Sequence, residues 1–154
     1  LRRLGSADRE FMFLARGDVS GNGRAEVLCA VKGRGLQRFT PPDDVRTGMW
    51  TESEIALPDG IGTGKGVAVG DLDLDGASDI VFTCENASGD KSGVRWLSHD
   101  KAKDAWIDHE ISGPAGVKFD RIELIDLDRD GDLDVLTCEE REKLGVIWYE
   151  NPAR

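Results

Sequence analysis

The feature that most constrains this chain is a nine-residue acidic pattern that occurs three times at nearly even spacing. The clearest copy, Asp126 to Asp134, reads DLDRDGDLD and holds five aspartates in nine positions. A second copy runs from Asp71 to Asp79 and a weaker one from Asp18 to Glu26, so the first aspartates stand 53 and 55 residues apart. Internal repeats with periods of about 20–50 residues are typical of solenoids and propellers, so the chain is expected to be built from similar structural units.

Short apolar runs repeat together with the acidic pattern. One run precedes each copy, a second follows it directly, and a third comes after a further turn; the first two copies have a fourth run as well. The runs lie at 11–14, 67–69 and 122–125, then at 27–29, 80–84 and 135–138, then at 35–39, 93–97 and 145–149, and last at 50–55 and 106–111. We expect strands rather than helices, because no apolar stripe with helical spacing is found.

Four short strands in each repeat predict an all-β fold, a β-propeller of four-stranded antiparallel blades with about three blades present. The acidic loop lies in the hairpin between a blade's first and second strands, and the apolar run after it suits a strand packed between neighbouring blades. We expect one propeller segment over residues 1–154, with blades at 5–58, 59–113 and 114–154. The last blade lacks its outer strand and residues 1–4 look like the tail of one, so the chain is expected to begin and end within a blade.

The side chains of the acidic loops suit a hard cation. Positions one, three and five carry short oxygen-bearing side chains that would point inward, position six is glycine, position seven would add a backbone carbonyl, and position nine would close the cage. Oxygen ligands in a flexible cage favour Ca²⁺ over Mg²⁺, and no His or Cys lies in these loops to suit a softer metal. The candidate ligands are Asp71, Asp73, Asp75, Ala77 and Asp79; Asp126, Asp128, Asp130, Asp132 and Asp134; and Asp18, Ser20, Asn22, Arg24 and Glu26.

An EF-hand and a solvated turn could also explain these loops. An EF-hand needs a bidentate Glu at position twelve, where this chain has Cys29, Phe82 and Thr137, and it needs flanking helices that the strand pattern excludes. A solvated turn is the other alternative, because Asp and Gly are turn formers, but two near-perfect copies in register favour metal. Ser20 and Asn22 are weaker ligands than aspartate, so we expect two calcium sites and a weaker third one.

The composition narrows the class of partner. A net charge of −10 argues against a nucleic-acid-binding protein, which would carry a basic face, and eleven of the acidic residues lie in the three loops. No run approaches the roughly 20 apolar residues of a membrane span. Three cysteines, with no closely spaced pair, are expected to be small core residues rather than zinc ligands.

The two strong copies, Asp71 to Asp79 and Asp126 to Asp134, have the form DxDxDGxxD, and with it the chain resembles the FG-GAP/VCBS repeats of integrin-like β-propellers. The run Trp148 to Pro152 is also typical of bacterial members. The resemblance covers nearly the whole chain and departs from the pattern in the loop at Asp18 to Glu26. It implies a secreted or cell-surface propeller of six to eight blades, with further blades supplied by a longer chain or a second copy.

For function, the resemblance implies a calcium-binding scaffold for adhesion or for binding glycan or protein ligands. The alternative is a segment of a carbohydrate-active enzyme of the lyase or dehydratase type. We expect a binding module rather than an enzyme, because the sequence shows no Ser/His/Asp set, no phosphate loop and no carboxylate pair outside the acidic loops.

Four further features have ordinary structural explanations. Asp18 of the tripeptide Arg16 to Asp18 is already part of an acidic loop, so a match to an adhesion signal is a coincidence. The glycosylation sequon at Asn86 to Ser88 suits a turn. The four tryptophans recur at fixed repeat positions and suit blade packing more than sugar stacking, and His109 suits a structural role.

Overall fold

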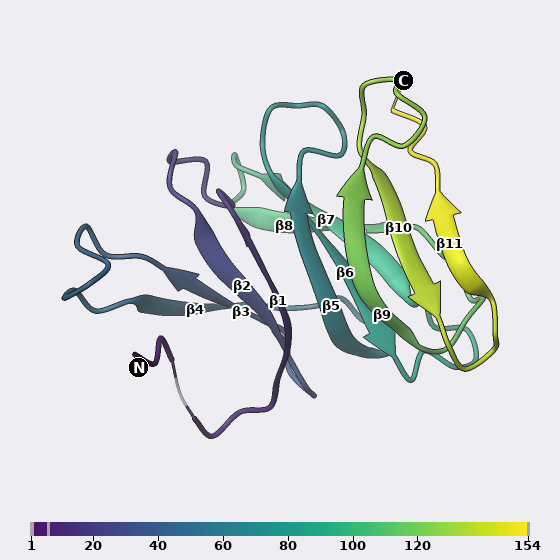
Figure 1. The fold of residues 1–154 in the computed structure, drawn as a ribbon, viewed down its shortest axis with the longest axis horizontal. Coiled ribbons are helices and arrows are strands. Elements are labelled where there is room, and N and C mark those ends of the chain that lie inside the picture. Colours follow the sequence, from purple (N-terminus) through teal and green to yellow (C-terminus); the bar gives the residue numbers. More distant parts are fainter. Residues whose placement is uncertain (1, 6, 154) are drawn as a thin grey trace.

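The computed structural model describes residues 2–5 and 7–153, and over these residues it contains strands and turns but no helix. Eleven strands form three antiparallel sheets (Figure 1). Sheet A consists of β1 (Phe11–Gly17), β2 (Glu26–Val31), β3 (Leu36–Thr40) and β4 (Thr51–Ile55). Sheet C consists of β5 (Thr63–Gly70), β6 (Asp79–Glu85), β7 (Val94–Asp100) and β8 (Ala105–Glu110). Sheet D consists of β9 (Phe119–Ile125), β10 (Asp134–Glu139) and β11 (Gly145–Tyr149).

The strand order confirms the repeat derived from the sequence. In each sheet the strands pair with their neighbours in chain order, and the acidic loops join β1 to β2, β5 to β6 and β9 to β10. The all-β fold with antiparallel units is therefore confirmed, while the three sheets do not form a closed ring and the propeller itself stays a prediction. Residues 2–4 have no regular structure, and Leu1 lies outside the described residues.

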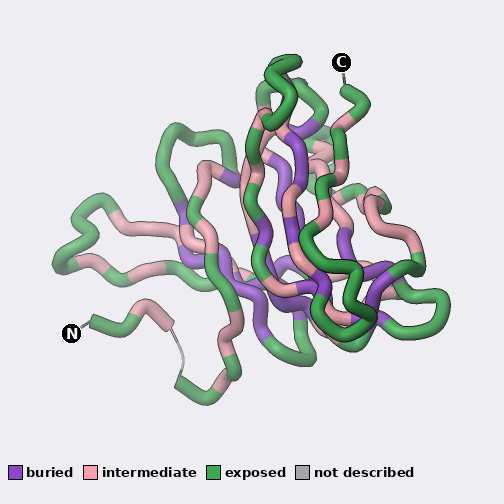
Figure 2. Tube along the Cα trace, turned by 45° about the vertical axis from the view of Figure 1, so that its right-hand side comes forward, coloured by how far each residue is buried: buried purple, intermediate pink, exposed green. Residues whose placement is uncertain are grey.

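The three sheets stand side by side, with β1, β5 and β9 next to one another and the acidic loops along one edge (Figure 1). Sheet C lies between the other two, and buried residues concentrate there (Figure 2). Ile80, Phe82 and Cys84 of β6 belong to the apolar cluster shared with sheet A. Val81 belongs to the second cluster, with Phe119 and Val135 of sheet D, among others. The strand after the acidic loop is thus buried on both faces, as its apolar sequence predicts.

Polar contacts join sheets C and D where the apolar clusters end. The Thr83 hydroxyl accepts a hydrogen bond from the Gly66 N–H (2.9 Å) and donates one to the Asp120 carbonyl (2.7 Å). The buried Lys65 ammonium lies between the Glu85 and Asp120 carboxylates. A side chain at position 66 would place its Cβ 2.3 Å from the Asp120 carbonyl oxygen, so this close approach requires glycine.

One buried carboxylate in sheet D organises two turns. Glu139, at the end of β10, accepts hydrogen bonds from the N–H groups of Val117 and Lys118 (3.1 Å each) and of Arg141 and Glu142 (3.1 and 3.0 Å). Burial alone would raise the pKa of this carboxyl, but the backbone donors outweigh burial and hold the pKa at about 2. Its charge therefore fixes the β10–β11 turn and the segment before β9.

We expect Glu139→Gln to lower the free energy of unfolding by about 2–3 kcal/mol at pH 7, because the lowered pKa of the native carboxylate stabilises the fold. Since the folded pKa lies below the unfolded value of 4.5, this contribution is complete above pH 4.5 and disappears as the pH falls towards 2. Urea unfolding of both proteins between pH 2.5 and 7 measures the difference. The exposed Glu150→Gln is the control, and a difference independent of pH would contradict the assignment.

Candidate metal centre

The three acidic loops share one backbone conformation. In every loop the residues at positions four and six have positive φ, which only glycine adopts without strain. Position four is Gly21 (68°), Leu74 (61°) and Arg129 (68°), and position six is Gly23 (82°), Gly76 (84°) and Gly131 (100°). The glycine predicted at the sharp turn is confirmed at position six. The left-handed Leu74 and Arg129 give no signal in the sequence.

Short side-chain to backbone hydrogen bonds set this conformation. The side-chain oxygen at position five accepts the N–H of position seven in all three loops, from Arg24 to Asn22 (2.9 Å), Ala77 to Asp75 (2.7 Å) and Asp132 to Asp130 (3.2 Å). In the two stronger loops the position-three aspartate likewise accepts the position-five N–H, at 3.2 Å. Such Asx turns are favoured by Asp and Asn, so the loop can form from its own sequence.

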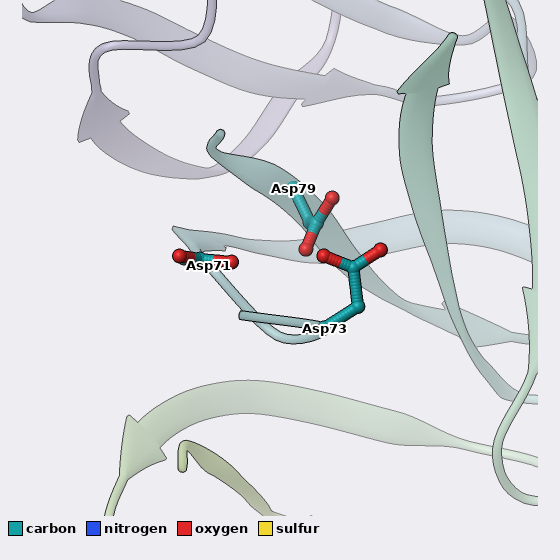
Figure 3. Close-up of side chains that lie close together, drawn as sticks. All are labelled: Asp71, Asp73 and Asp79. Carbon is teal, nitrogen blue, oxygen red and sulfur yellow. The ribbon is translucent and has the colours of Figure 1, made fainter. Parts of the chain in front are cut away.

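Carboxylates converge in the two stronger loops. Asp71, Asp73 and Asp79 each offer an oxygen within 4.8 Å of the others, and the same holds for Asp126, Asp128 and Asp130. In the first triad, Asp73 projects from the loop towards Asp79 at the start of β6, with Asp71 beside them (Figure 3). Either triad could hold a metal ion.

The residue at position one gives a second, independent sign of a cation in each triad. One buried oxygen of Asp71 and one of Asp126, Oδ1 in both, have no hydrogen-bond partner in the structure. A buried carboxylate oxygen without a donor is costly, and a cation would satisfy it. The same atom lacks a donor in two loops that share the same backbone turn, so the position-one Oδ1 is the candidate contact to an ion in both.

The pKa of Asp79 also indicates that the Asp71 loop would be stabilised by a cation. Asp79 is buried, and burial is the main cause that raises its pKa to about 6; the charges of Asp73 and Asp75 raise it further. The Leu72 N–H, 2.8 Å from Asp79 Oδ2, opposes this rise without cancelling it. A cation between these carboxylates would replace their repulsion by attraction and favour the charged form.

The Asp126 loop differs at position nine. Both oxygens of Asp134 accept backbone hydrogen bonds, from Leu127 (3.1 Å) and Asn151 (2.9 Å). Burial would raise the pKa of Asp134, but these donors lower it. The Asn151 amide also donates to the carbonyls of Leu72 (2.8 Å) and Leu133 (3.1 Å), so it joins the two loops. Asp134 does not belong to the carboxylate triad of its loop. Backbone N–H groups occupy both of its oxygens and would compete with an ion for them.

In the loop at Asp18, hydrogen-bond donors of the protein engage both carboxylates, Asp18 and Glu26. Asp18 accepts the N–H groups of Asn22 (2.9 Å) and Gly23 (2.6 Å). Glu26 accepts the Ser20 N–H (3.0 Å) and the Thr40 hydroxyl (2.8 Å), and Arg38 lies 3.8 Å from it. The loop contains two carboxylates rather than four or five, so it needs a cation less than its two counterparts do.

Two further features singled out in the sequence, the tripeptide 16–18 and His109, make contacts within the fold. Gly17 packs against Val69, where an added Cβ would lie 2.3 Å away, and Asp18 is held in its loop, so the tripeptide 16–18 is part of the fold. The structure brings together one pair that the sequence did not indicate: Ser98 Oγ lies 2.9 Å from His109 Nε2. The His109 ring stacks on Trp96 at 4.0 Å between centroids, which makes it a packing residue of the β7–β8 pair.

Comparison with models of known protein families gives no match, and comparison with curated proteins also gives none. Among the described residues there is no helix long and apolar enough to cross a membrane.

We expect the metal-free protein to lose stability as the pH rises from about 4 to about 7. The raised pKa of Asp79 means that its contribution is complete below the unfolded value of 3.8 and is lost as the pH passes about 6, with a cost of about 3 kcal/mol. Asp79→Asn removes this charge and should flatten the profile of unfolding free energy in EDTA. The exposed Asp59→Asn is the control, and equal profiles for both variants would contradict the explanation.

Proposed function

We propose that this chain is a calcium-binding segment of a β-propeller that serves as a binding or adhesion scaffold. The observation that carries the calcium proposal is the buried Oδ1 of Asp71 and of Asp126, each without a donor inside a triad of carboxylates. All of the candidate side-chain ligands in these triads are hard oxygen atoms, which Ca²⁺ prefers. Ala77 and Asp132, at position seven of their loops, are proposed to bind the ion through the backbone carbonyl oxygen.

The proposed role of the ion is structural. Each triad lies in the hairpin that leads into a buried strand, β6 or β10, so an ion there would tie the start of that strand to the loop. Three antiparallel sheets placed side by side support the propeller. The secreted or cell-surface location is proposed from the resemblance to FG-GAP/VCBS repeats alone. A hollow lined by residues of β1, β5 and β9, the strands that stand next to one another in Figure 1, offers a place for a ligand.

We expect calorimetric titration of the EDTA-treated protein to give two calcium sites, because two of the three loops form triads with an oxygen that lacks a donor. Asp71→Asn and Asp126→Asn should each reduce the number of sites to one, while Asn22→Ala should leave two. Calcium at 100 times Kd should raise the unfolding free energy by about 2.7 kcal/mol per site. A melting temperature unchanged by chelator would contradict the proposal, and three equal sites would contradict the ranking of the loops.

The scaffold proposal predicts calcium-dependent binding of a glycan or a surface protein without chemical change to the ligand. A glycan array probed with labelled protein, in calcium and in EDTA, measures the first kind of ligand. The double variant Asp71→Asn/Asp126→Asn serves as the control, since loss of both ions should loosen the hairpins and reduce binding. Appearance of an eliminated or hydrolysed sugar would instead support a carbohydrate-active enzyme.

A further inference from the structure

A polar hollow of about 360 Å³ lies between sheets A and C, at the edge opposite the acidic loops, where β2 and β6 end (Figure 1). Three segments line it. They are the β2–β3 turn with Arg34, the connection of residues 57–64 that leads from β4 into β5, and the loop between β6 and β7 with Lys91. Both sheets have all four strands, so the segments around the hollow belong to two complete units of the repeat.

The backbone around the hollow is held in place by neighbouring segments. The Ser92 N–H donates to the Gly60 carbonyl (3.1 Å), and Ile61 forms a β-bridge with Ser92. A Cβ at position 62 would lie 2.2 Å from the carbonyl oxygen of Glu85, so this close approach of two segments requires glycine. The shape of the hollow is therefore fixed before a ligand binds, which lowers the entropy cost of binding.

Two cations at the hollow have no carboxylate partner. Arg34 and Lys91 are exposed, and neither forms an ion pair or a side-chain hydrogen bond with any residue that the structure describes. By contrast, Lys32 in the same turn as Arg34 pairs with Glu10 at 2.9 Å. In a chain with a net charge of −10, two unpaired cations from different sheets make this hollow a local positive site.

The corresponding place between sheets C and D contains an internal carboxylate. The register pairs Gly64 with Cys84 across β5 and β6. It pairs Phe119 with Glu139 in the same way across β9 and β10, so Cys84 is the counterpart of Glu139. The Glu139 carboxylate accepts N–H groups of the segment before β9, whereas the Gly62 N–H of the segment before β5 meets the Cys84 thiol.

The junction of sheets A and C therefore lacks the internal anion that the next junction has. Burial raises the pKa of the Cys84 thiol to about 12, so this side chain is neutral at pH 7. The carboxylate of the following residue, Glu85, lies 3.3 Å from the Lys65 ammonium. Arg34 and Lys91 are thus available to an anion from outside the chain.

We propose that this hollow binds a sugar residue that carries one anionic group, a carboxylate or a sulfate, with that group between Arg34 and Lys91. The inference rests on the proposed scaffold function and names the kind of glycan that the scaffold takes. Both groups are planar or compact arrays of oxygen atoms that accept charged hydrogen bonds from guanidinium and ammonium groups.

The other residues of the hollow favour a sugar over an acidic peptide or a densely charged polymer. Asp59 and Thr63 carry oxygen atoms to which sugar hydroxyls can hydrogen-bond, and Leu57 and Pro58 offer apolar contact to the C–H face of a ring. A volume of about 360 Å³ suits a ligand of one or two rings. Because Asp59 and the net charge of −10 repel polyanions, a ligand with isolated charges is favoured.

The probes are three methyl glycosides that share the glucose ring and differ at carbon 6: the glucuronide, the 6-sulfate and the neutral glucoside. Each is titrated into the ¹⁵N-labelled full chain in calcium, and the amide signals of residues 57–64 and of Lys91 are followed by NMR. We expect saturable shifts with at least one anionic sugar and at least about tenfold weaker binding of the neutral one, because the charged hydrogen bonds are lost. The tighter anionic sugar identifies the group as carboxylate or sulfate. Absence of saturable shifts with both, or equal affinity for the neutral glucoside, would overturn the proposal.

Two variants of the protein locate the site. Arg34→Gln and Lys91→Gln each remove one cation and should weaken binding of the anionic sugar at least about fivefold. Lys143→Gln is the matched control, because Lys143 is an exposed cation in the β10–β11 turn, the counterpart in sheet D of the loop that holds Lys91. Since all three side chains are exposed, the melting temperatures should agree. Equal affinity of the three variants for the anionic sugar would contradict the assignment.

The results separate this inference from the proposed function. Binding of neutral glycans or of a surface protein, without saturable shifts from either anionic sugar, would leave the scaffold proposal in place and show that this site is wrong. Shifts that Arg34→Gln and Lys91→Gln weaken, in a chain that binds no calcium, would support this site and contradict the calcium proposal alone.

Discussion

The structure depends on the burial of β6 between two sheets. Alternate side chains of this strand point to opposite faces, so Ile80 and Phe82 pack towards sheet A while Val81 packs towards sheet D. Strand β2 also has four buried apolar residues, but β6 lies in the middle sheet and contributes to both apolar clusters. Thr83 on the second face places its hydroxyl between backbone groups of β5 and β9, which lets a polar residue occupy an interface without an unpaired group. The three sheets are joined through this one strand and its neighbours.

Much of this arrangement could be predicted from the sequence because the same pattern is written three times. Each apolar run became a strand, and each acidic loop joined the expected pair, since alternation and turn chemistry act locally. The sequence could not show that Asp134 is engaged by Asn151, because that bond joins residues 17 positions apart across a turn. Nor could it show the role of Glu139, whose donors come from two separate segments. Leu74 and Arg129 are residues that disfavour positive φ, so their conformation is imposed by the turns around them.

The loop at Asp18 shows which residues the backbone conformation shared by the three acidic loops requires. It has the same left-handed positions as the other two loops, yet its carboxylates are satisfied by Thr40, Ser20 and nearby backbone groups. The loop conformation therefore follows from glycine and Asx turns, and does not need a full set of carboxylates. What distinguishes the Asp71 and Asp126 loops is surplus negative charge in the same frame, and a buried oxygen that no protein donor reaches. Charge, rather than backbone shape, separates the two loops that could hold a metal ion from the loop at Asp18.

The alternation of faces in β6 has one further consequence, which concerns direction. Ile80 of sheet C faces sheet A, and its counterpart Val135 of sheet D faces sheet C, so sheets C and D turn the same face towards the preceding sheet. The two ends of the row of sheets are therefore different: one exposes the outer face of sheet A and the other the outer face of sheet D. A contact between two such rows that continues the internal packing must join unlike ends, which is a heterologous contact; a two-fold contact that joins like ends would have to use different chemistry. A contact that continues the internal packing would therefore join the sheet D end of one molecule to the sheet A end of another.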